Sequence, residues 1–145
     1  MKTLLASLLL AVAAGSALAQ DTPAGLWKTI DDATKAEKSL VRVTESAGIY
    51  TGKVEKILTD KTDAKCTECS DARKDQPVQG MTILRDIKQD PSDNTLWIGG
   101  DILDPNNGKV YKVRVKPVEG GKKLELRGYI GTPLLGRTQT WIRVE

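Results

Sequence analysis

The sequence predicts an all-β domain in which eight short antiparallel strands close into an up-and-down barrel. Apolar and polar residues alternate over several segments, most clearly in residues 111–116, as in strands with one buried face. Turn clusters rich in glycine, proline, asparagine and aspartate separate these segments, and the domain lacks a convincing amphipathic helical pattern. A two-sheet sandwich is the alternative, but closure into a barrel leaves no exposed strand edge.

Residues 1–19 are expected to form a secretory signal peptide rather than part of the domain. Lys2 supplies a positive start, residues 4–12 form an apolar run, and Ala17-Leu18-Ala19 is a cleavage signal before Gln20. The apolar run is too short to span a membrane. The residue after the predicted cleavage site is Gln20 and not a cysteine, so we do not expect a lipid anchor there. We therefore expect an exported protein with a single domain over residues 20–145.

The first half of the domain is predicted to hold three strands and one long loop. The strands are expected at residues 25–30, 39–44 and 49–58, and residues 59–79 show neither strand nor helix periodicity. This long segment contains both cysteines of the chain, Cys66 and Cys69. A loop of this length inside a compact domain is uncommon and is usually functional or tethered.

A fourth strand at residues 81–87 and a turn cluster at residues 89–94 lead into a central hairpin over residues 96–116. In its turn, Pro105 presets φ, Gly108 accepts a positive φ, and Asp104 is expected to cap the turn through its side chain. After the turn, alternation places apolar and basic side chains on opposite faces: Tyr111, Val113 and Val115 against Lys112, Arg114 and Lys116.

The strand before that turn contains Gly99-Gly100, which indicates a bend or a β-bulge of the kind found in curled sheets. Simple alternation places Leu96, Ile98 and Ile102 on one face of this strand and Trp97, Asp101 and Leu103 on the other. The last two strands are predicted at residues 122–130 and 136–144.

Composition narrows the possible chemistry. The chain has no histidine, which excludes Ser-His and Cys-His catalysis and histidine metal sites within it. The net charge is +3, or +2 without Lys2, and its basic residues are scattered, so no nucleic-acid partner is indicated. An enzyme would need a reactive cysteine or paired carboxylates such as Asp101 and Asp104, which need not converge across a strand end. We expect no enzyme activity, no metal and no cofactor.

The Cys66-Thr67-Glu68-Cys69 motif favours a structural disulfide, because an oxidising compartment leaves paired thiols bridged. Zinc would need four ligands, and the chain offers no second cysteine pair. A thioredoxin-like redox motif would need a βαβ context. Because the bridge would close only a very short loop, its expected role is to hold the long loop in one shape.

Two further groups of residues are expected at the ends of the barrel. The first and last strands of a closed barrel pair with each other, so we expect Trp27 and Arg143 to pack together and close one end; ligand stacking is the alternative role for the tryptophan. Arg127 and Arg137 flank Tyr129 on neighbouring strands, where both arginines could converge on a carboxylate or phosphate. Alternatively, they pair with nearby acidic residues or remain in solvent.

Several motifs together resemble a known family. They are GLW at residues 25–27, CTEC at residues 66–69, LWIGGDILDPNNGKVYK at residues 96–112 and LRGYIGTPLLGRTQTW at residues 126–141. This pattern is similar to that of DUF2147, a family of uncharacterised secreted bacterial proteins, and covers essentially the whole domain. The resemblance implies a lipocalin-like or calycin-like barrel in the periplasm of Gram-negative bacteria. It implies no established activity.

The leading functional hypothesis is a non-enzymatic periplasmic binding protein that holds a small apolar or amphipathic molecule in the barrel. A monomer without a membrane span is favoured. The candidate ligand-binding residues are Trp97, Tyr111, Arg127, Tyr129, Arg137 and Trp141. The alternative is a solid barrel that acts as a protein-interaction or envelope-stress module through the long loop or the basic strand faces.

Overall fold

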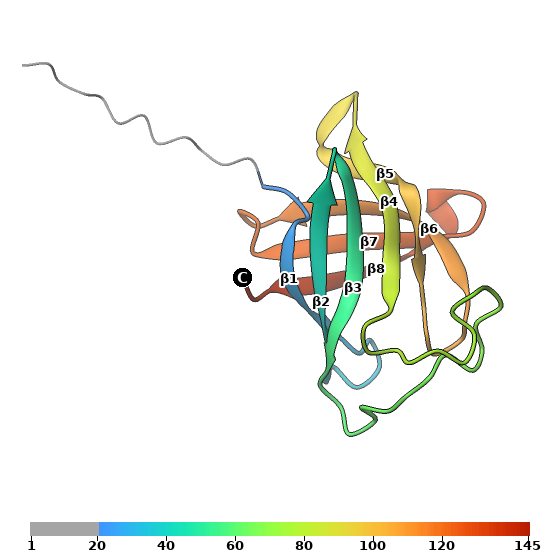
Figure 1. Ribbon diagram of the computed structural model, residues 1–145. Helices are drawn as coiled ribbons and strands as arrows, with labels where there is room; N and C mark the ends of the chain where they lie inside the picture. The colour runs from blue at the N-terminus through green and yellow to red at the C-terminus, as the bar shows by residue number, and fades with distance from the viewer. Residues whose placement is uncertain (1–20) are drawn as a thin grey trace, which may run out of the picture.

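The computed structural model describes residues 21–145 of the 145-residue chain, so the expected signal peptide and its cleavage site lie outside the described residues. Eight antiparallel strands form a closed barrel in which each strand pairs with the next and the last pairs with the first (Figure 1). The strands are β1 (Gly25–Ile30), β2 (Glu37–Ser46), β3 (Ile49–Ile57), β4 (Thr82–Asp90), β5 (Asp93–Leu103), β6 (Val110–Val118), β7 (Lys123–Tyr129) and β8 (Arg137–Arg143). A short 3₁₀ turn, η1 (Pro133–Leu135), precedes β8.

The predicted barrel is therefore confirmed, and the sandwich is excluded. One boundary differs in an instructive way, because β4 and β5 continue into the predicted turn cluster at residues 89–94. Only Pro91 and Ser92 remain outside the two strands. The carboxylate of Asp90 accepts hydrogen bonds from both the backbone N–H and the hydroxyl of Ser92 at 2.8 Å, which completes so short a turn.

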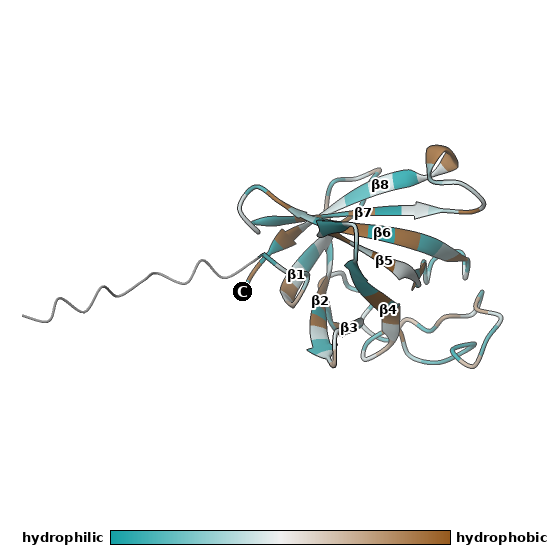
Figure 2. Cartoon of the chain, turned by 90° about the horizontal axis from the view of Figure 1, so that it is seen from above, coloured by the Kyte–Doolittle hydropathy of each residue, from teal (hydrophilic) through white to brown (hydrophobic). Residues whose placement is uncertain are grey.

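Alternation along the strands builds the interior. In β6, Val113 and Val115 are buried, whereas Lys112, Arg114 and Lys116 are exposed, as predicted. Hydrophilic and hydrophobic colours both occur along β2 and β6 in Figure 2. The largest fully buried side chains are Trp27, Trp97, Trp141, Leu84, Ile87, Leu124, Val41, Val43, Val113 and Val115.

The two faces of β5 differ from the prediction. Gly99 has φ +87° and forms a β-bulge, because Trp97 pairs with Val115 while Gly100 pairs with Val113. The extra residue reverses the alternation beyond it. Trp97 and Ile102, predicted to lie on opposite faces, therefore both point inward. Trp97 is fully buried, and Ile102 packs against the core from beyond the bulge.

One end of the barrel is closed by the expected contact between the first and last strands. The Arg143 guanidinium lies 4.2 Å from the centre of the buried Trp27 ring. Its Nη1 and Nη2 donate hydrogen bonds to the carbonyls of Ala24 at 2.9 Å and Thr22 at 3.0 Å, and its Nε donates to the Gly121 carbonyl. A single side chain thus ties the segment before β1 to the β6–β7 turn.

The long loop between β3 and β4 is fastened to the barrel at its cysteines. The predicted disulfide between Cys66 and Cys69 is confirmed, and both residues are buried. The loop packs against the β5–β6 turn so closely that a Cβ on Gly108 would overlap the backbone of Glu68, and Gly108 also has φ +71°. The backbone of the disulfide motif therefore packs directly against Gly108, and this contact requires glycine at that position.

Replacing Cys66 and Cys69 together with alanine is expected to loosen this loop more than it destabilises the barrel. The bridge spans three residues, so the loss of global stability should lie at the low end of the usual disulfide range, about 1–2 kcal/mol. Hydrogen exchange should accelerate across residues 59–79 while the amides of β6 stay protected. Equal acceleration in β6 would contradict a local role for the bridge.

A second anchor of this loop predicts a specific acid sensitivity. Arg73 forms an ion pair with Asp71 at 2.6 Å, and its Nη1 donates a hydrogen bond to the Thr82 carbonyl at the start of β4 at 2.8 Å. The hydrogen bonds from the Arg73 side chain and backbone lower the pKa of Asp71 to about 2. Since folding lowers this pKa, the stabilisation is complete above the unfolded value near 4 and is lost as the pH falls toward 2.

Asp71→Asn should therefore flatten the pH dependence of the free energy of unfolding between pH 4 and pH 2, the interval set by the two pKa values of Asp71. Urea unfolding at several pH values would measure this effect. Asp90→Asn is a suitable comparison, because hydrogen bonds from Ser92 lower the pKa of Asp90 without any loop anchor. Parallel pH profiles for wild type and Asp71→Asn would contradict the assignment.

Candidate functional site

The candidate site is a cavity of about 900 Å³ at the end of the barrel opposite the Trp27 closure. Four connections surround it: the β1–β2 loop, the first part of the β3–β4 loop, the β5–β6 turn and the β7–β8 connection. Because strands run alternately up and down, these connections all meet at one end of the barrel. The volume lies in the range of pockets that bind small molecules.

The inner wall of the cavity is mainly aliphatic and aromatic. Its apolar side chains come from β3, β4, β5, β7 and β8: Val54, Ile57, Ile83, Ile102, Leu126 and Trp141. Gly128 also contributes to the wall, and a Cβ added there would come no closer than 3.5 Å to another atom, that atom being Tyr111 Cβ. The wall thus offers an apolar surface in which a methyl group beside β7 would make ordinary van der Waals contacts.

Polar groups gather where the wall meets the mouth. Gln139 Nε2 donates a hydrogen bond to Asp32 Oδ2 at 3.1 Å, and Arg137 Nε lies 3.5 Å from the same oxygen. Deeper along β1 and β2, the hydroxyls of Thr29 and Ser39 are hydrogen-bonded to each other at 2.7 Å. The site therefore combines an apolar wall with a charged edge formed by β8 and the β1–β2 loop.

Two buried indole N–H groups have no hydrogen-bond acceptor within the described part of the chain, those of Trp97 and Trp141. Buried donors are usually paired, since leaving one unpaired costs free energy. Trp141 lines the cavity, whereas Trp97 lies outside its lining and makes an edge-to-face contact with Tyr50 at 6.0 Å between ring centroids.

Four of the six predicted ligand-binding residues line the cavity: Tyr111, Tyr129, Arg137 and Trp141. The hydroxyl of Tyr111 accepts a hydrogen bond from Asn107 Nδ2 at 3.2 Å, which links that ring to the β5–β6 turn. Trp97 does not line the cavity. It pairs with Val115 and lies buried in the filled half of the barrel, so the structure does not bring it together with the other predicted ligand-binding residues.

The structure does not bring Arg127 and Arg137 together on one anion, and the alternative of pairing with a nearby acidic residue holds for Arg137, which lies 3.5 Å from Asp32. Gly128 pairs with Arg137 and Arg127 pairs with Thr138, so successive positions put the two arginines on opposite faces of the sheet. Arg137 lies at the cavity mouth, whereas Arg127 donates hydrogen bonds outside it, to the Pro133 carbonyl at 2.6 Å and to Thr138 Oγ1 at 3.0 Å. The sequence alone did not reveal that the two arginines lie on opposite faces, because the faces depend on which residues pair across β7 and β8.

Sequence reasoning missed two polar members of the site, Asp32 and Gln139. Gln139 lies two residues from both Arg137 and Trp141, so alternation along β8 would have placed it on the same inward face. Asp32 belongs to a charged loop in which Asp31 caps the turn by accepting hydrogen bonds from Ala33 and Thr34. Nothing in the sequence distinguishes the carboxylate that reaches β8 from the one that caps.

The acidic residues weighed for catalysis have structural roles. Asp101 forms a bidentate ion pair with Arg85 at 2.9 Å and 3.0 Å. Asp104 caps its turn, as expected, by accepting a hydrogen bond from the Asn106 N–H at 2.9 Å. Within residues 21–145, no group of three or more potential metal ligands lies together. Nor does this part of the chain contain a helix long and apolar enough to cross a membrane.

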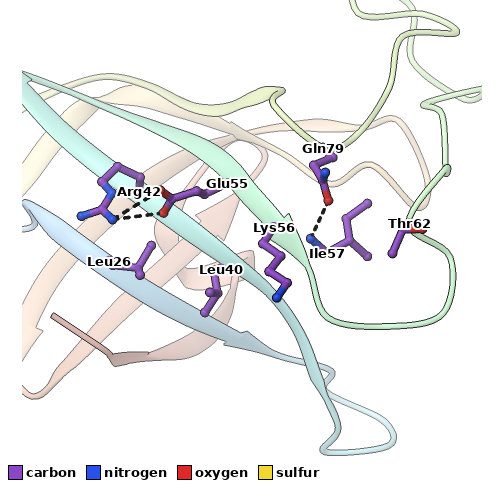
Figure 3. A pocket seen from close by; sticks show the side chains of 8 residues that line it. All are labelled: Leu26, Leu40, Arg42, Glu55, Lys56, Ile57, Thr62 and Gln79. Atoms are coloured by element: carbon purple, nitrogen blue, oxygen red, sulfur yellow. Dashed lines mark hydrogen bonds and ion pairs between the residues drawn. The ribbon is translucent and has the colours of Figure 1, made fainter.

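A second depression lies outside the barrel, over β1, β2, β3 and the β3–β4 loop (Figure 3). It is shallow and open, and Arg42 at its edge is paired with Glu55 at 3.2 Å and with Glu145 at 2.8 Å. Gln79 accepts a hydrogen bond from the Ile57 N–H at 3.2 Å. Because its strongest polar groups already have partners, the interior cavity is the better candidate for a ligand site.

Comparisons with known proteins agree with this architecture. A solved structure described as "Protein HP1028 from the human pathogen Helicobacter pylori belongs to the lipocalin family" is similar, with a TM-score of 0.73 and 21% identity over 87% of this chain and 85% of that one. This likeness shows a lipocalin-like fold. No curated protein matches the sequence. The model of DUF2147, described as "Uncharacterized protein conserved in bacteria", matches residues 25–143, which include all eight strands. The chain therefore belongs to the DUF2147 family.

Proposed function

We propose that this protein is a non-enzymatic carrier of the bacterial periplasm that holds a small amphipathic molecule in the open half of its barrel. The observation that carries the proposal is the cavity of about 900 Å³, with its apolar wall and charged mouth. A barrel of eight strands can be filled by side chains or can hold one small ligand. Here only the half around Trp27 and Trp97 is filled, which favours a carrier over a solid interaction module.

The distribution of polar groups supports an amphipathic ligand with an acidic head. Arg137 has a side chain that is 66% exposed at the mouth, and its one ion pair within residues 21–145 is the long contact of 3.5 Å with Asp32. An anionic head group can compete for that guanidinium, since arginine binds carboxylates and phosphates with paired hydrogen bonds. The body of the ligand would then lie along Ile83, Ile102 and Leu126.

Trp141 contributes ring surface to the cavity wall, whereas its indole N–H is buried away from the cavity space. The wall beside this ring therefore suits the apolar body of an amphipathic ligand. Export to the periplasm, predicted from residues 1–19, would give such a carrier access to molecules of the cell envelope.

The test is native mass spectrometry of the protein released gently from the bacterial periplasm. The proposal expects a reproducible added mass that disappears under denaturing conditions, followed by identification of the extracted molecule. The apo mass alone, obtained repeatedly from periplasm without detergent, would contradict the carrier proposal. An added mass that appears only on unfolded protein, and not on the native protein, would contradict binding of the ligand in the cavity.

A further inference from the structure

An exposed apolar tip stands beside the cavity mouth. Ile130 is 63% exposed, Leu134 88% and Leu135 81%, the largest exposures among the large hydrophobic residues of the described chain. All three lie in the connection between β7 and β8, where the hydrophobic turn η1 stands out in Figure 2. Ile130 and Leu135 also contribute to the cavity lining, so the tip forms part of the rim.

The exposure of the tip belongs to an ordered turn. Arg127 on the outer face of β7 donates hydrogen bonds to the carbonyls of Pro133 at 2.6 Å and Leu134 at 3.5 Å. The backbone adds a bond from the Leu135 N–H to the Thr132 carbonyl at 3.1 Å. The turn therefore holds its leucines outward, although burying such side chains would be favourable.

A row of cations adjoins the tip on the outer face of β6 and β7. Arg114 pairs directly across the sheet with Arg127, and Lys112 and Lys116 are its neighbours on the same face of β6. Like charges placed directly opposite each other destabilise a sheet. Lys112 and Arg114 form no ion pair with any carboxylate of residues 21–145, and Asp101, opposite Lys112, is held by Arg85. Lys116 lies directly opposite Glu125 on β7, so Lys112 and Arg114 are the members of the row that are open to an external anion.

We propose that the tip and the basic row dock the protein on a membrane surface that contains anionic lipids. The leucines would enter the boundary between head groups and acyl chains, and Lys112 and Arg114 would face the lipid phosphates. An apolar anchor and a basic patch are the two signals that give reversible membrane binding when combined. A partner protein fits less well, because the apolar area is a small protruding tip rather than a broad surface.

This docking goes beyond the carrier proposal and does not depend on it. Because Ile130 and Leu135 belong to the rim, docking would also bring the cavity mouth to the lipid head groups. A carrier could then exchange an amphipathic molecule with the bilayer without exposing the molecule to water. Only this exchange of a ligand with the bilayer rests on the proposed function; the docking itself does not.

Vesicle flotation with the purified protein tests the docking. Wild type should float with vesicles of phosphatidylcholine and phosphatidylglycerol and much less with phosphatidylcholine alone. The double variant Leu134→Ser with Leu135→Ser should lose about 10-fold or more in the partition coefficient, because little else holds the tip in the bilayer. Lys112→Ser with Arg114→Ser should lose a similar factor, about 10-fold, for anionic vesicles only.

The matched control is Lys53→Ser with Lys56→Ser, which removes the same charge from exposed positions of β3 and should leave flotation unchanged. Arg127 is left intact in every variant because it holds the turn, and circular dichroism checks the fold. Failure of wild type to float, or equal flotation of the leucine variant, would overturn the proposal. So would self-association of wild type that the leucine substitutions abolish, in the absence of vesicle binding.

Gly128→Leu separates the two proposals. This substitution should fill space in the cavity wall while leaving the tip and the basic row in place. We expect it to float like wild type with anionic vesicles. Flotation without any cavity ligand would leave the docking proposal standing and remove only the carrier proposal, whereas a loaded cavity without flotation would do the reverse.

Discussion

Gly100→Ala is expected to destabilise the barrel by about 3 kcal/mol or more, a large fraction of the stability of a domain of this size. A Cβ at this position would overlap the Arg85 carbonyl oxygen on β4 and lie 2.8 Å from both the Asp86 carbonyl carbon and Ile87 Cγ2. Most of these atoms are backbone, so no change of rotamer relieves the overlap. The crowding follows from two facing irregularities, at Asp86 (φ +58°) and at Gly99.

Gly48→Ala is the matched control for this variant. Gly48 has φ +82° in the β2–β3 turn, but a Cβ there would meet no atom within 4 Å. Its replacement should cost only the conformational strain of a positive φ, about 1 kcal/mol. Urea unfolding followed by tryptophan fluorescence measures both variants. Equal losses would show that the close approach of β4 and β5 has no special role.

Arg143→Met should be the second most damaging substitution, with a loss of about 3 kcal/mol or more from charged hydrogen bonds that cannot be replaced. The guanidinium donates to the carbonyls of Thr22, Ala24 and Gly121 and stacks on Trp27. Methionine keeps the apolar length of the side chain but leaves these carbonyls without their donor.

The position of Arg143 raises the expected cost. The seam between β1 and β8 has only two registered residue pairs, Trp27 with Arg143 and Lys28 with Ile142, fewer than any other strand pair in the barrel. Opening this seam would expose two strand edges. Hydrogen exchange in β1 and β8 should therefore accelerate before exchange in β5 and β6.

Arg42→Met provides the comparison within the same sheet. Arg42 lies on the outer surface, where its side chain is 38% exposed and pairs with Glu55 and Glu145. Surface ion pairs of this kind contribute about 0–1 kcal/mol. If Arg42→Met and Arg143→Met lowered the free energy of unfolding equally, the closure assigned to Arg143 would be wrong.

Much of the fold follows from local sequence patterns. Alternation in β6 identified both its buried and its exposed faces, and the residues of the preceding turn, from Asp104 to Gly108, have the capping and positive φ expected of them. These features depend on neighbours two to four residues apart, which the sequence displays directly. The disulfide was predictable because its two cysteines lie in one short motif and have no competing partner.

The site was predicted less well, because it depends on register. A single extra residue at Gly99 turned Trp97 and Ile102 to the same face, although the paired glycines themselves indicated a bulge. The two arginines, Arg127 and Arg137, occupy neighbouring strands, but their faces depend on which residue pairs with Gly128. Cross-strand register is set by the whole barrel, so a one-residue uncertainty suffices to exchange inside and outside.

The most direct test of the central claim is titration with the fluorescent amphiphile anilinonaphthalene sulfonate, comparing wild type with Gly128→Ala and Gly128→Leu. Gly128 faces the cavity, and an added Cβ has ordinary contacts, so alanine should be tolerated and leucine should occupy ligand space. We predict saturable binding of one probe per wild-type molecule, similar binding by Gly128→Ala, and loss of binding in a folded Gly128→Leu. Equal binding by all three proteins, or none by wild type, would contradict a carrier built on this cavity.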